Sequence, residues 1–191
     1  MQQITKASEL LVKKNVINRV TDVPGGCSIA VSNLVAGSYV EEGTPLTAPA
    51  TGVRIVCKQA KVLANPTATV VQVAEKSHNF KVGDFIGTKL LGKAYAITTI
   101  TNASGIDTLT VGTAIDTPTI GDFIYEMEAE SASNTSALKN TPEVIVKSPF
   151  EVPSTTTLIL QKDALVRADI HAGVVGSVYL ATLPGVIEIT Y

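Results

Sequence analysis

The sequence predicts an all-β protein built from small β-barrel or sandwich domains, with short loops and at most one short helix. Val, Thr and Ile, whose branched side chains suit a pleated and half-buried surface, make up 62 of the 191 residues. Several segments alternate apolar and polar residues with a period of two, which is the spacing of a half-buried strand. Gly and Pro recur at short intervals, as expected where a chain turns often between strands.

Length and charge narrow the classes of function. A chain of 191 residues accommodates one extended domain or two small ones. The net charge is −2, and no run of Lys or Arg is longer than Lys13-Lys14, so the chain lacks the basic patch that drives phosphate binding. The first residues do not resemble a secretory signal, and no apolar run approaches the ~20 residues of a spanning helix. We therefore expect neither a nucleic-acid partner nor a membrane.

The first 20 residues are interpreted as an N-terminal arm. Ser8 is a candidate cap for a short helix that starts at Glu9, but the β-branched residues that follow disfavour its extension. The arm carries large apolar side chains with little partner surface of its own. We expect it either to bind a neighbouring chain or to pack on its own domain as an edge strand. The candidate partner-binding residues are Leu10, Leu11, Val12, Val16, Ile17 and Val20.

The clearest strand pattern lies in residues 67–128, which we interpret as a small β-barrel. Residues 95–99 and 106–111 are predicted strands, joined by the four-residue hairpin loop 102–105. The remaining predicted segments are the arm 1–20, a loop-rich β unit 21–66, a polar linker or loop 129–142, and C-terminal strands 143–191 that complete the fold. Because a strand pattern runs to the last residue, we expect the C-terminus to be held in a sheet.

A short motif occurs twice in the predicted barrel. Val-Gly-Asp-Phe-Ile at residues 82–86 recurs as Ile-Gly-Asp-Phe-Ile at residues 120–124, a spacing of 38 residues. In each copy Gly and Asp suit a tight turn that leads into an apolar strand. We therefore predict that Gly83 and Gly121 occupy equivalent positive-φ or bulge positions and that the two copies open corresponding strands.

Candidate catalytic and metal-binding groups are few. Cys27 follows a Pro-Gly-Gly turn that would expose a thiol, with His78 or His171 as the candidate base, but no protease-type signature surrounds it; the alternative is a small buried residue. With Cys57 there are four residues that could bind zinc, yet these four lack the paired spacing of a zinc site.

The carboxylates and glycines are equally uninformative about catalysis. Glu126, Glu128 and Glu130 are interpreted as the solvated edge of the linker, and Glu41-Glu42 as a turn. The chain has no Trp, and its glycines do not form a nucleotide-binding loop. We therefore predict a binding or structural protein without a catalytic, cofactor or metal site.

The order of segments after residue 57 resembles the head fibre or capsid decoration proteins of tailed bacteriophages, particularly those of gut Bacteroidales and crAss-like phages. The segments that carry the resemblance are 58–63, 78–86, 96–100 with 106–112, and 121–126, followed by 164–170 and 183–187. They span roughly the last two-thirds of the chain, and the first 57 residues match no part of the family pattern.

The resemblance implies a non-enzymatic virion protein on the head surface, made in the cytoplasm of the host bacterium. Its expected partners are the major capsid protein or neighbouring virion proteins, with a homo-oligomer, most simply a trimer, and no cofactor. Two other classes stay open from the residues alone. One is a glycan-binding adhesin or tail-associated β module, and the other is a carbohydrate-active β domain.

Overall fold

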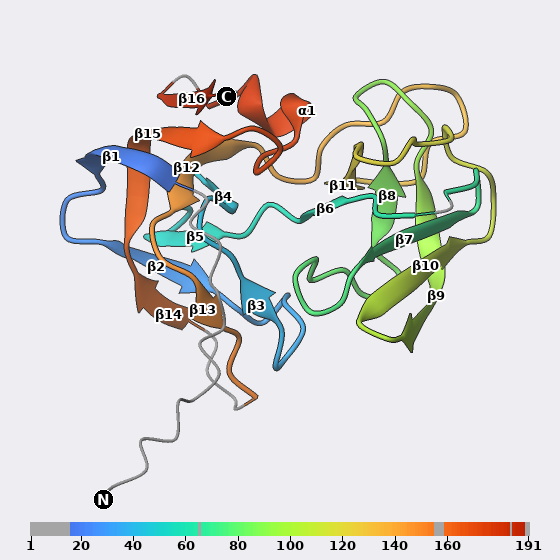
Figure 1. Ribbon diagram of the computed structural model, residues 1–191, viewed down its shortest axis with the longest axis horizontal. Helices are drawn as coiled ribbons and strands as arrows, with labels where there is room; N and C mark the ends of the chain where they lie inside the picture. The colour runs from blue at the N-terminus through green and yellow to red at the C-terminus, as the bar shows by residue number, and fades with distance from the viewer. Residues whose placement is uncertain (1–15, 65, 155–158, 184, 190–191) are drawn as a thin grey trace, which may run out of the picture.

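Strands dominate the computed structural model, which describes residues 16–64, 66–154, 159–183 and 185–189 (Figure 1). These residues contain sixteen strands and one helix of four residues, so the all-β prediction is confirmed. The chain forms two lobes that lie side by side. We call residues 16–57 with 142–189 the terminal lobe, and residues 59–127 the inserted lobe. No helix in the described ranges is long and apolar enough to span a membrane.

The terminal lobe is built from both ends of the chain. Its five-stranded sheet has the order β1 (Val16–Asp22), β15 (Ala164–His171), β12 (Pro142–Val146) and β4 (Pro45–Thr47), with β16 (Val186–Ile189) parallel to β15. A three-stranded sheet contains β14 (Ile159–Lys162), β2 (Cys27–Ala30) and β5 (Val53–Ile55), and a two-stranded sheet contains β13 (Phe150–Glu151) and β3 (Tyr39–Val40). Helix α1 (Ser177–Leu180) precedes β16. Strands far apart in the sequence therefore share every sheet of this lobe.

The inserted lobe is one six-stranded sheet. Its order is β6 (Gln59–Lys61), β11 (Phe123–Met127), β8 (Phe85–Gly87), β9 (Tyr95–Ala103), β10 (Ile106–Val111) and β7 (Val70–Ala74). The sheet curls until its two edges approach, where the Leu63 N–H donates to the Gln72 carbonyl over 2.9 Å and Ala64 forms an isolated bridge with Gln72. Among the described residues no continuous ladder joins β6 to β7, so the barrel expected for residues 67–128 is not closed. The sheet also begins at Gln59, before residue 67.

The predicted hairpin joins β9 and β10, but its turn is tighter than expected. Asn102 pairs with Asp107 and Ala103 with Ile106, which leaves only Ser104 and Gly105 in the turn. Both have positive φ, 53° and 81°, the requirement of a two-residue type I′ turn whose twist matches that of the strands. The four-residue loop of the prediction is therefore wrong by two residues.

The repeated motif forms the same turn twice. Gly83 and Gly121 both have φ 94°, as predicted. In one copy the Lys81 N–H donates to Asp84 Oδ2 over 2.8 Å, and in the other the Thr119 N–H donates to Asp122 Oδ2 over 2.7 Å. Each aspartate thus closes a turn around a glycine that supplies the conformation L residues disfavour.

The two copies are also related in space. Strands β8 and β11, which follow the two turns, are antiparallel neighbours, with Gly87 opposite Tyr125. The N–H of Gly83 donates to the Ile97 carbonyl and that of Gly121 to the Val62 carbonyl, both over 2.9 Å. The turns therefore lie at opposite ends of a strand pair with approximate two-fold symmetry, and corresponding strands open as predicted.

One of three hydrophobic clusters is shared by the lobes. It includes Tyr125 and Met127 of β11, together with Ile145, Leu165 and Tyr179 of the terminal lobe. The rings of Tyr125 and Tyr179 meet edge to face, with centroids 5.0 Å apart. Because interior packing is close and specific, this shared cluster fixes the orientation of one lobe on the other.

The last described strand, β16, pairs with β15, whereas residues 190–191, on which the expectation for the C-terminus rests, lie outside the described residues. Val186 is buried, whereas Ile187 is 59% exposed. Strand β16 lies at a sheet edge, where Ile189 is half-buried and the Glu188 carboxylate accepts the Gly173 N–H. The segment 129–142 is mostly exposed, as predicted, although Ser131 and Ser136 are buried and hydrogen-bonded to the loop around Gly92.

Replacing Gly83 or Gly121 with Ala should destabilise the protein by about 1–2 kcal/mol each, because a Cβ is strained at φ 94°. The space around Gly83 is open, so the cost there comes from the backbone alone. Gly112 lacks a positive φ and its added Cβ would lie 3.3 Å from Thr98 Cγ2, so Gly112→Ala is the matched control. Urea denaturation measures all three, and equal stabilities would contradict the shared turn.

Candidate functional site

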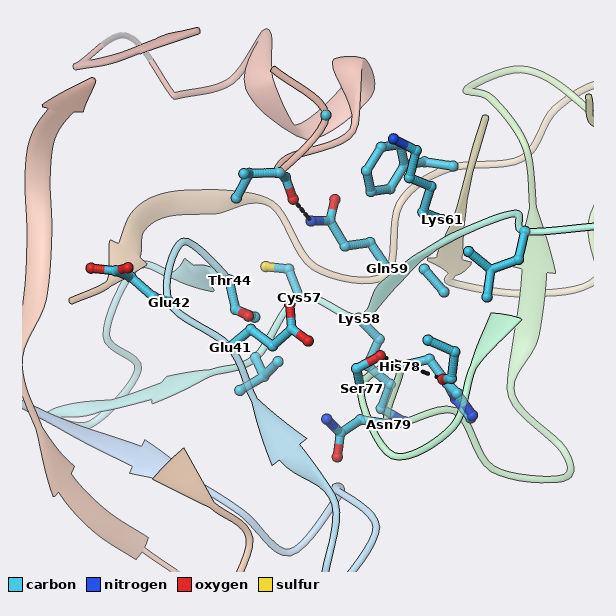
Figure 2. Close-up of a pocket in the computed structure, with 17 residues that line it drawn as sticks. Glu41, Glu42, Thr44, Cys57, Lys58, Gln59, Lys61, Ser77, His78 and Asn79 are labelled. Carbon is cyan, nitrogen blue, oxygen red and sulfur yellow. Dashed lines mark hydrogen bonds between the residues drawn. The ribbon is translucent and has the colours of Figure 1, made fainter. Parts of the chain in front are cut away.

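A cleft of about 210 Å³ lies between the lobes (Figure 2). Its walls come from the turn 41–44 and the loop 173–174 of the terminal lobe, and from residues 59–63 and 74–79 of the inserted lobe. The chain segment that crosses between the lobes, residues 56–58, forms its base. The cleft is the place where side chains from distant parts of the sequence meet.

Two adjacent glutamates of the turn 41–44 face in different directions. The turn is closed by a hydrogen bond of 3.1 Å from the Thr44 N–H to the Glu41 carbonyl, with Gly43 at φ 88°. Glu42 is buried and its carboxylate lies 2.6 Å from the Arg19 guanidinium. Glu41 is exposed and borders the cleft. The predicted turn is present. Within it, the Glu42 carboxylate binds Arg19 inside the protein, whereas the Glu41 carboxylate borders the cleft.

His78 lines the cleft but has both ring nitrogens engaged. Nδ1 accepts the Phe80 N–H over 2.9 Å, so the proton of the neutral ring sits on Nε2, which lies 2.8 Å from Asp107 Oδ2. The other oxygen of Asp107 accepts the side-chain amide of Asn102 over 2.8 Å. Each polar atom of this pair is thus hydrogen-bonded within the inserted lobe.

Asn79 fastens the terminal lobe to the inserted lobe. Its side chain is buried, and its backbone has φ 60°, a conformation that Asn tolerates better than most residues. Its Oδ1 accepts the Val35 N–H over 3.2 Å, and its Nδ2 donates to the Tyr39 carbonyl over 3.0 Å. The Tyr39 N–H in turn donates to the Lys76 carbonyl over 2.7 Å.

Gln59 makes an equivalent connection on the far side of the cleft. Its side-chain amide donates to the Val174 carbonyl over 3.0 Å, and its Oε1 accepts the Gly176 N–H over 2.9 Å. Because Gln59 belongs to β6 and both partners belong to the terminal lobe, the two walls of the cleft are held at a fixed separation.

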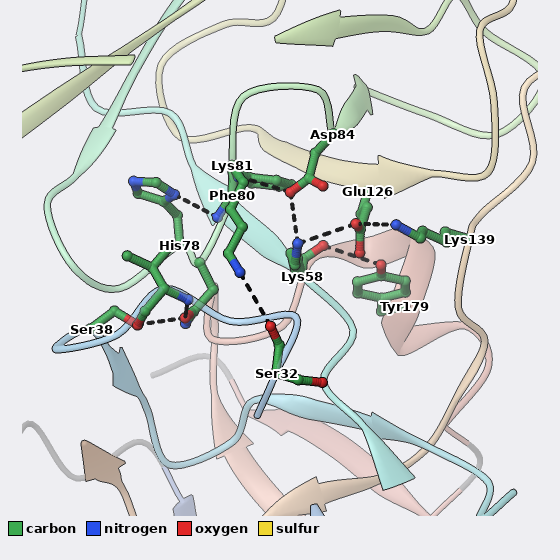
Figure 3. Close-up of polar contacts among 12 residues, drawn as sticks. Ser32, Ser38, Lys58, His78, Phe80, Lys81, Asp84, Glu126, Lys139 and Tyr179 are labelled. Carbon is green, nitrogen blue, oxygen red and sulfur yellow. Dashed lines mark hydrogen bonds and ion pairs between the residues drawn. The ribbon is translucent and has the colours of Figure 1, made fainter. Parts of the chain in front are cut away.

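A buried network of charges lies beside the cleft (Figure 3). Lys58 Nζ is 2.7 Å from Asp84 Oδ2 and 3.3 Å from Glu126 Oε1, and Lys139 Nζ is 2.7 Å from the same Glu126 oxygen. The side chains of Lys58 and Glu126 are only 2% and 1% exposed. Two positive and two negative charges therefore balance around the buried Lys58–Glu126 pair, while Lys139 is 48% exposed.

Tyr179 and Cys57 surround this network on the terminal-lobe side. The Tyr179 hydroxyl donates to the Lys58 carbonyl over 3.2 Å. Burial, together with the nearby Cys57 and Glu126, holds the pKa of Tyr179 well above its ordinary value, so the phenol keeps its proton. Burial, and secondarily Glu126, also raises the pKa of the Cys57 thiol. Glu126 is thus buried between two lysines, and its interpretation as a solvated linker edge is wrong.

The candidate nucleophile Cys27 lies in the core of the terminal lobe. It is buried on β2, and its strand neighbour across the ladder is Lys162. Burial raises the pKa of its thiol, with Arg54 opposing and Asp163 adding to the shift. His78 lies in the inserted lobe, bonded to Asp107. The alternative of a small buried residue is therefore what the structure supports.

In the described ranges, no three His, Cys, Asp or Glu side chains gather closely enough to hold a metal ion.

The predicted partner-binding arm is only partly described. Leu10, Leu11 and Val12 lie outside the described residues. Val16 is buried at the start of β1, an edge strand that pairs with β15, whereas Val20 is 52% exposed and Ile17 is half-buried. Residues 16–20 therefore follow the edge-strand alternative.

The residues that build the cleft were largely missed by sequence reasoning. Lys58, Gln59 and Asn79 carry no motif, and their roles depend on partners more than 25 residues away in the chain. One available signal was the motif itself, since Asp84 of the repeated turn is the residue that binds Lys58.

Lys58→Met should destabilise the protein by about 3–5 kcal/mol, because it removes the buried cation that Glu126, which is buried, and Asp84, which is partly buried, share. Lys76→Met is the matched control. Lys76 is 59% exposed and 3.8 Å from Glu75, so its loss should change stability by less than about 1 kcal/mol. Chemical denaturation of both variants measures the difference. Similar losses for the two lysines would show that the network is not stabilising.

Both thiols should be unreactive in the folded protein, since burial raises their pKa and blocks access. We expect an aromatic disulfide reagent at pH 8 to react on the order of 100-fold more slowly with the native chain than with the chain in urea. Cys27→Ser and Cys57→Ser, each tested alone, identify which thiol reacts. A native rate equal to the denatured rate would restore Cys27 as a candidate nucleophile.

Comparison with known proteins finds no matching family model, no matching curated protein and no matching solved structure.

Proposed function

We propose that this chain is a structural virion protein that decorates a phage head, as a head fibre or auxiliary capsid protein bound to the major capsid protein. The observation that supports the proposal most is where the resembling segments lie. Residues 58–63, 78–86, 96–100, 106–112 and 121–126 include β6 and β10 and parts of β8, β9 and β11. All are strands of the six-stranded sheet of the inserted lobe. The remaining resembling segments, 164–170 and 183–187, contribute to β15 and β16 of the terminal lobe. Most of the segments that resemble the family thus belong to one structural unit.

The use of the polar groups is also consistent with a structural role. Lys58, Glu126, Gln59 and Asn79 all join the two lobes or the segments that cross between them. A rigid connection between lobes suits a subunit that must keep one shape while it is held on a particle. Repeated copies on a capsid would multiply weak contacts through avidity. A homo-oligomer, most simply a trimer, fits this role.

The attachment segment in this proposal is the N-terminal arm, without the arm residue that is buried in the terminal lobe. Val16 is buried within its own lobe and is unavailable to a partner. Val20 is 52% exposed on the edge strand β1. Contact with the capsid therefore involves Val20 and the apolar residues of segment 1–15.

Binding to purified heads that lack this protein tests the attachment, after mass spectrometry of complete particles has tested whether the chain is present. Deleting residues 2–15 should abolish binding and leave the melting temperature unchanged. Val20→Asp should weaken binding by about tenfold or more, because it loses apolar contact and buries a charge. Val82→Asp is the control, since Val82 is 61% exposed in the other lobe.

Two results would overturn the proposal. If the chain is absent from purified particles, it is not a virion protein. If the deletion variant binds heads as well as the full chain does, the arm is not the anchor.

A second candidate function, a glycan-binding adhesin or tail-associated module, is favoured by one specific feature, the polar groups of the cleft.

A further inference from the structure

Three polar side chains of the cleft have unused hydrogen-bonding capacity. Within the described part of the chain, no ion pair or side-chain hydrogen bond engages the Glu41 carboxylate, the Thr44 hydroxyl or the Lys61 ammonium. Their neighbours Glu42 and Gln59, by contrast, bind other parts of the protein. The cleft thus separates residues that hold the fold from residues that remain free to meet a ligand.

These free groups come from different elements and line the same space. Glu41 and Thr44 are the ends of the turn that leads into β4, and Lys61 is the last residue of β6. Ser77 adds a hydroxyl whose only described hydrogen bond, to the Ala74 carbonyl, is long at 3.4 Å. Figure 2 shows Lys61 on the other side of the cleft from Glu41 and Ser77, and the Ser77 hydroxyl directed along its hydrogen bond to Ala74 rather than toward Glu41.

An apolar surface completes the cleft. Leu63 is 40% exposed, and Ala74, Phe123 and Val174 line the same space. A ligand that fits must therefore offer hydrogen-bonding groups on one side and C–H groups on another. Few convergent polar groups in a largely apolar concavity are typical of small-molecule sites.

The charges and the volume narrow the class of ligand. An anion would meet the free carboxylate of Glu41, and a cation would meet the free ammonium of Lys61, so neither ion is favoured alone. A hydroxyl donates to a carboxylate and accepts from an ammonium, so several hydroxyls satisfy both. A volume of about 210 Å³ is below the ~300–1,000 Å³ of drug-sized sites and suits one small ring.

We propose that this cleft binds a single neutral sugar ring, with Glu41 accepting ligand hydroxyls, Thr44 and Lys61 donating to ligand oxygens, and Phe123 and Leu63 contacting its C–H face. The walls are held in place by Asn79 and Gln59, so little ordering is needed on binding. This inference goes beyond the virion role and does not depend on it.

Titration of the ¹⁵N-labelled full chain with methyl glycosides of glucose, galactose and mannose tests the proposal. We expect at least one glycoside to shift the amide signals of Glu41, Thr44 and Lys61 with a Kd on the order of 1 mM. Glu41→Ala and Thr44→Val should each weaken binding, the former by about tenfold or more, because hydrogen bonds to charged groups are the stronger ones. Glu130→Ala, an exposed carboxylate of the segment 129–142, is the matched control and should bind as the parent does.

Melting temperatures confirm that the variants fold, which is expected because the replaced groups have no described partner. Sodium phosphate and ammonium chloride serve as the ionic probes. The proposal is overturned if no glycoside shifts the cleft signals, if Glu41→Ala binds as tightly as the parent, or if either salt shifts these signals and the glycosides do not. None of these results bears on whether the chain is present in virions.

Discussion

The arrangement of the two lobes depends on one buried carboxylate. The chain crosses between the lobes twice, and Glu126 binds a lysine of each crossing, Lys58 in the first and Lys139 in the second. Electrostatic interactions are stronger where water is excluded, and a buried charge without a partner is costly. Its second oxygen, Oε2, has no hydrogen-bond partner among the described residues, so the lysines carry the whole compensation of this charge. Glu126 of the inserted lobe is therefore bonded to both of the chain segments that connect this lobe to the terminal lobe.

The cleft is a consequence of this constraint. Once the crossings are fixed, Asn79 and Gln59 hold the opposing walls by hydrogen bonds to backbone groups of the terminal lobe. Tyr125 and Tyr179 pack edge to face in the hydrophobic cluster that the lobes share. The hydrogen-bonding groups of Asn79 and Gln59 are occupied by these backbone partners. Glu41, Thr44 and Lys61 therefore remain as polar side chains of the cleft without a partner in the described part of the protein. A scaffold and a candidate site thus occupy the same junction without sharing residues.

The repeated turn connects the local sequence to this junction. Asp84 closes the turn around Gly83 through the Lys81 N–H, and the same Oδ2 atom accepts Lys58. Its counterpart Asp122 closes the equivalent turn with Thr119 and lies at the other end of the β8–β11 pair. One copy of the motif is therefore purely local, whereas the other also helps to hold the lobes together. The physical difference is the presence of a buried lysine next to one turn.

The sequence by itself determined the features that depend on neighbouring residues. The β-branched composition and the period of two indicated strands, and Gly-Asp indicated the positive φ of Gly83 and Gly121, because backbone sterics act within a few residues. Only the tertiary structure decided that the C-terminal strands pair with the N-terminal ones, that the hairpin turn has two residues, and that Glu42 and Glu126 are buried while Glu41 is exposed. The burial of a carboxylate depends on which lysine or arginine the fold brings beside it. The arginine partner of Glu42 lies 23 residues away, and the lysine partners of Glu126 lie 13 residues away (Lys139) and in the other crossing (Lys58), all beyond the reach of any local pattern.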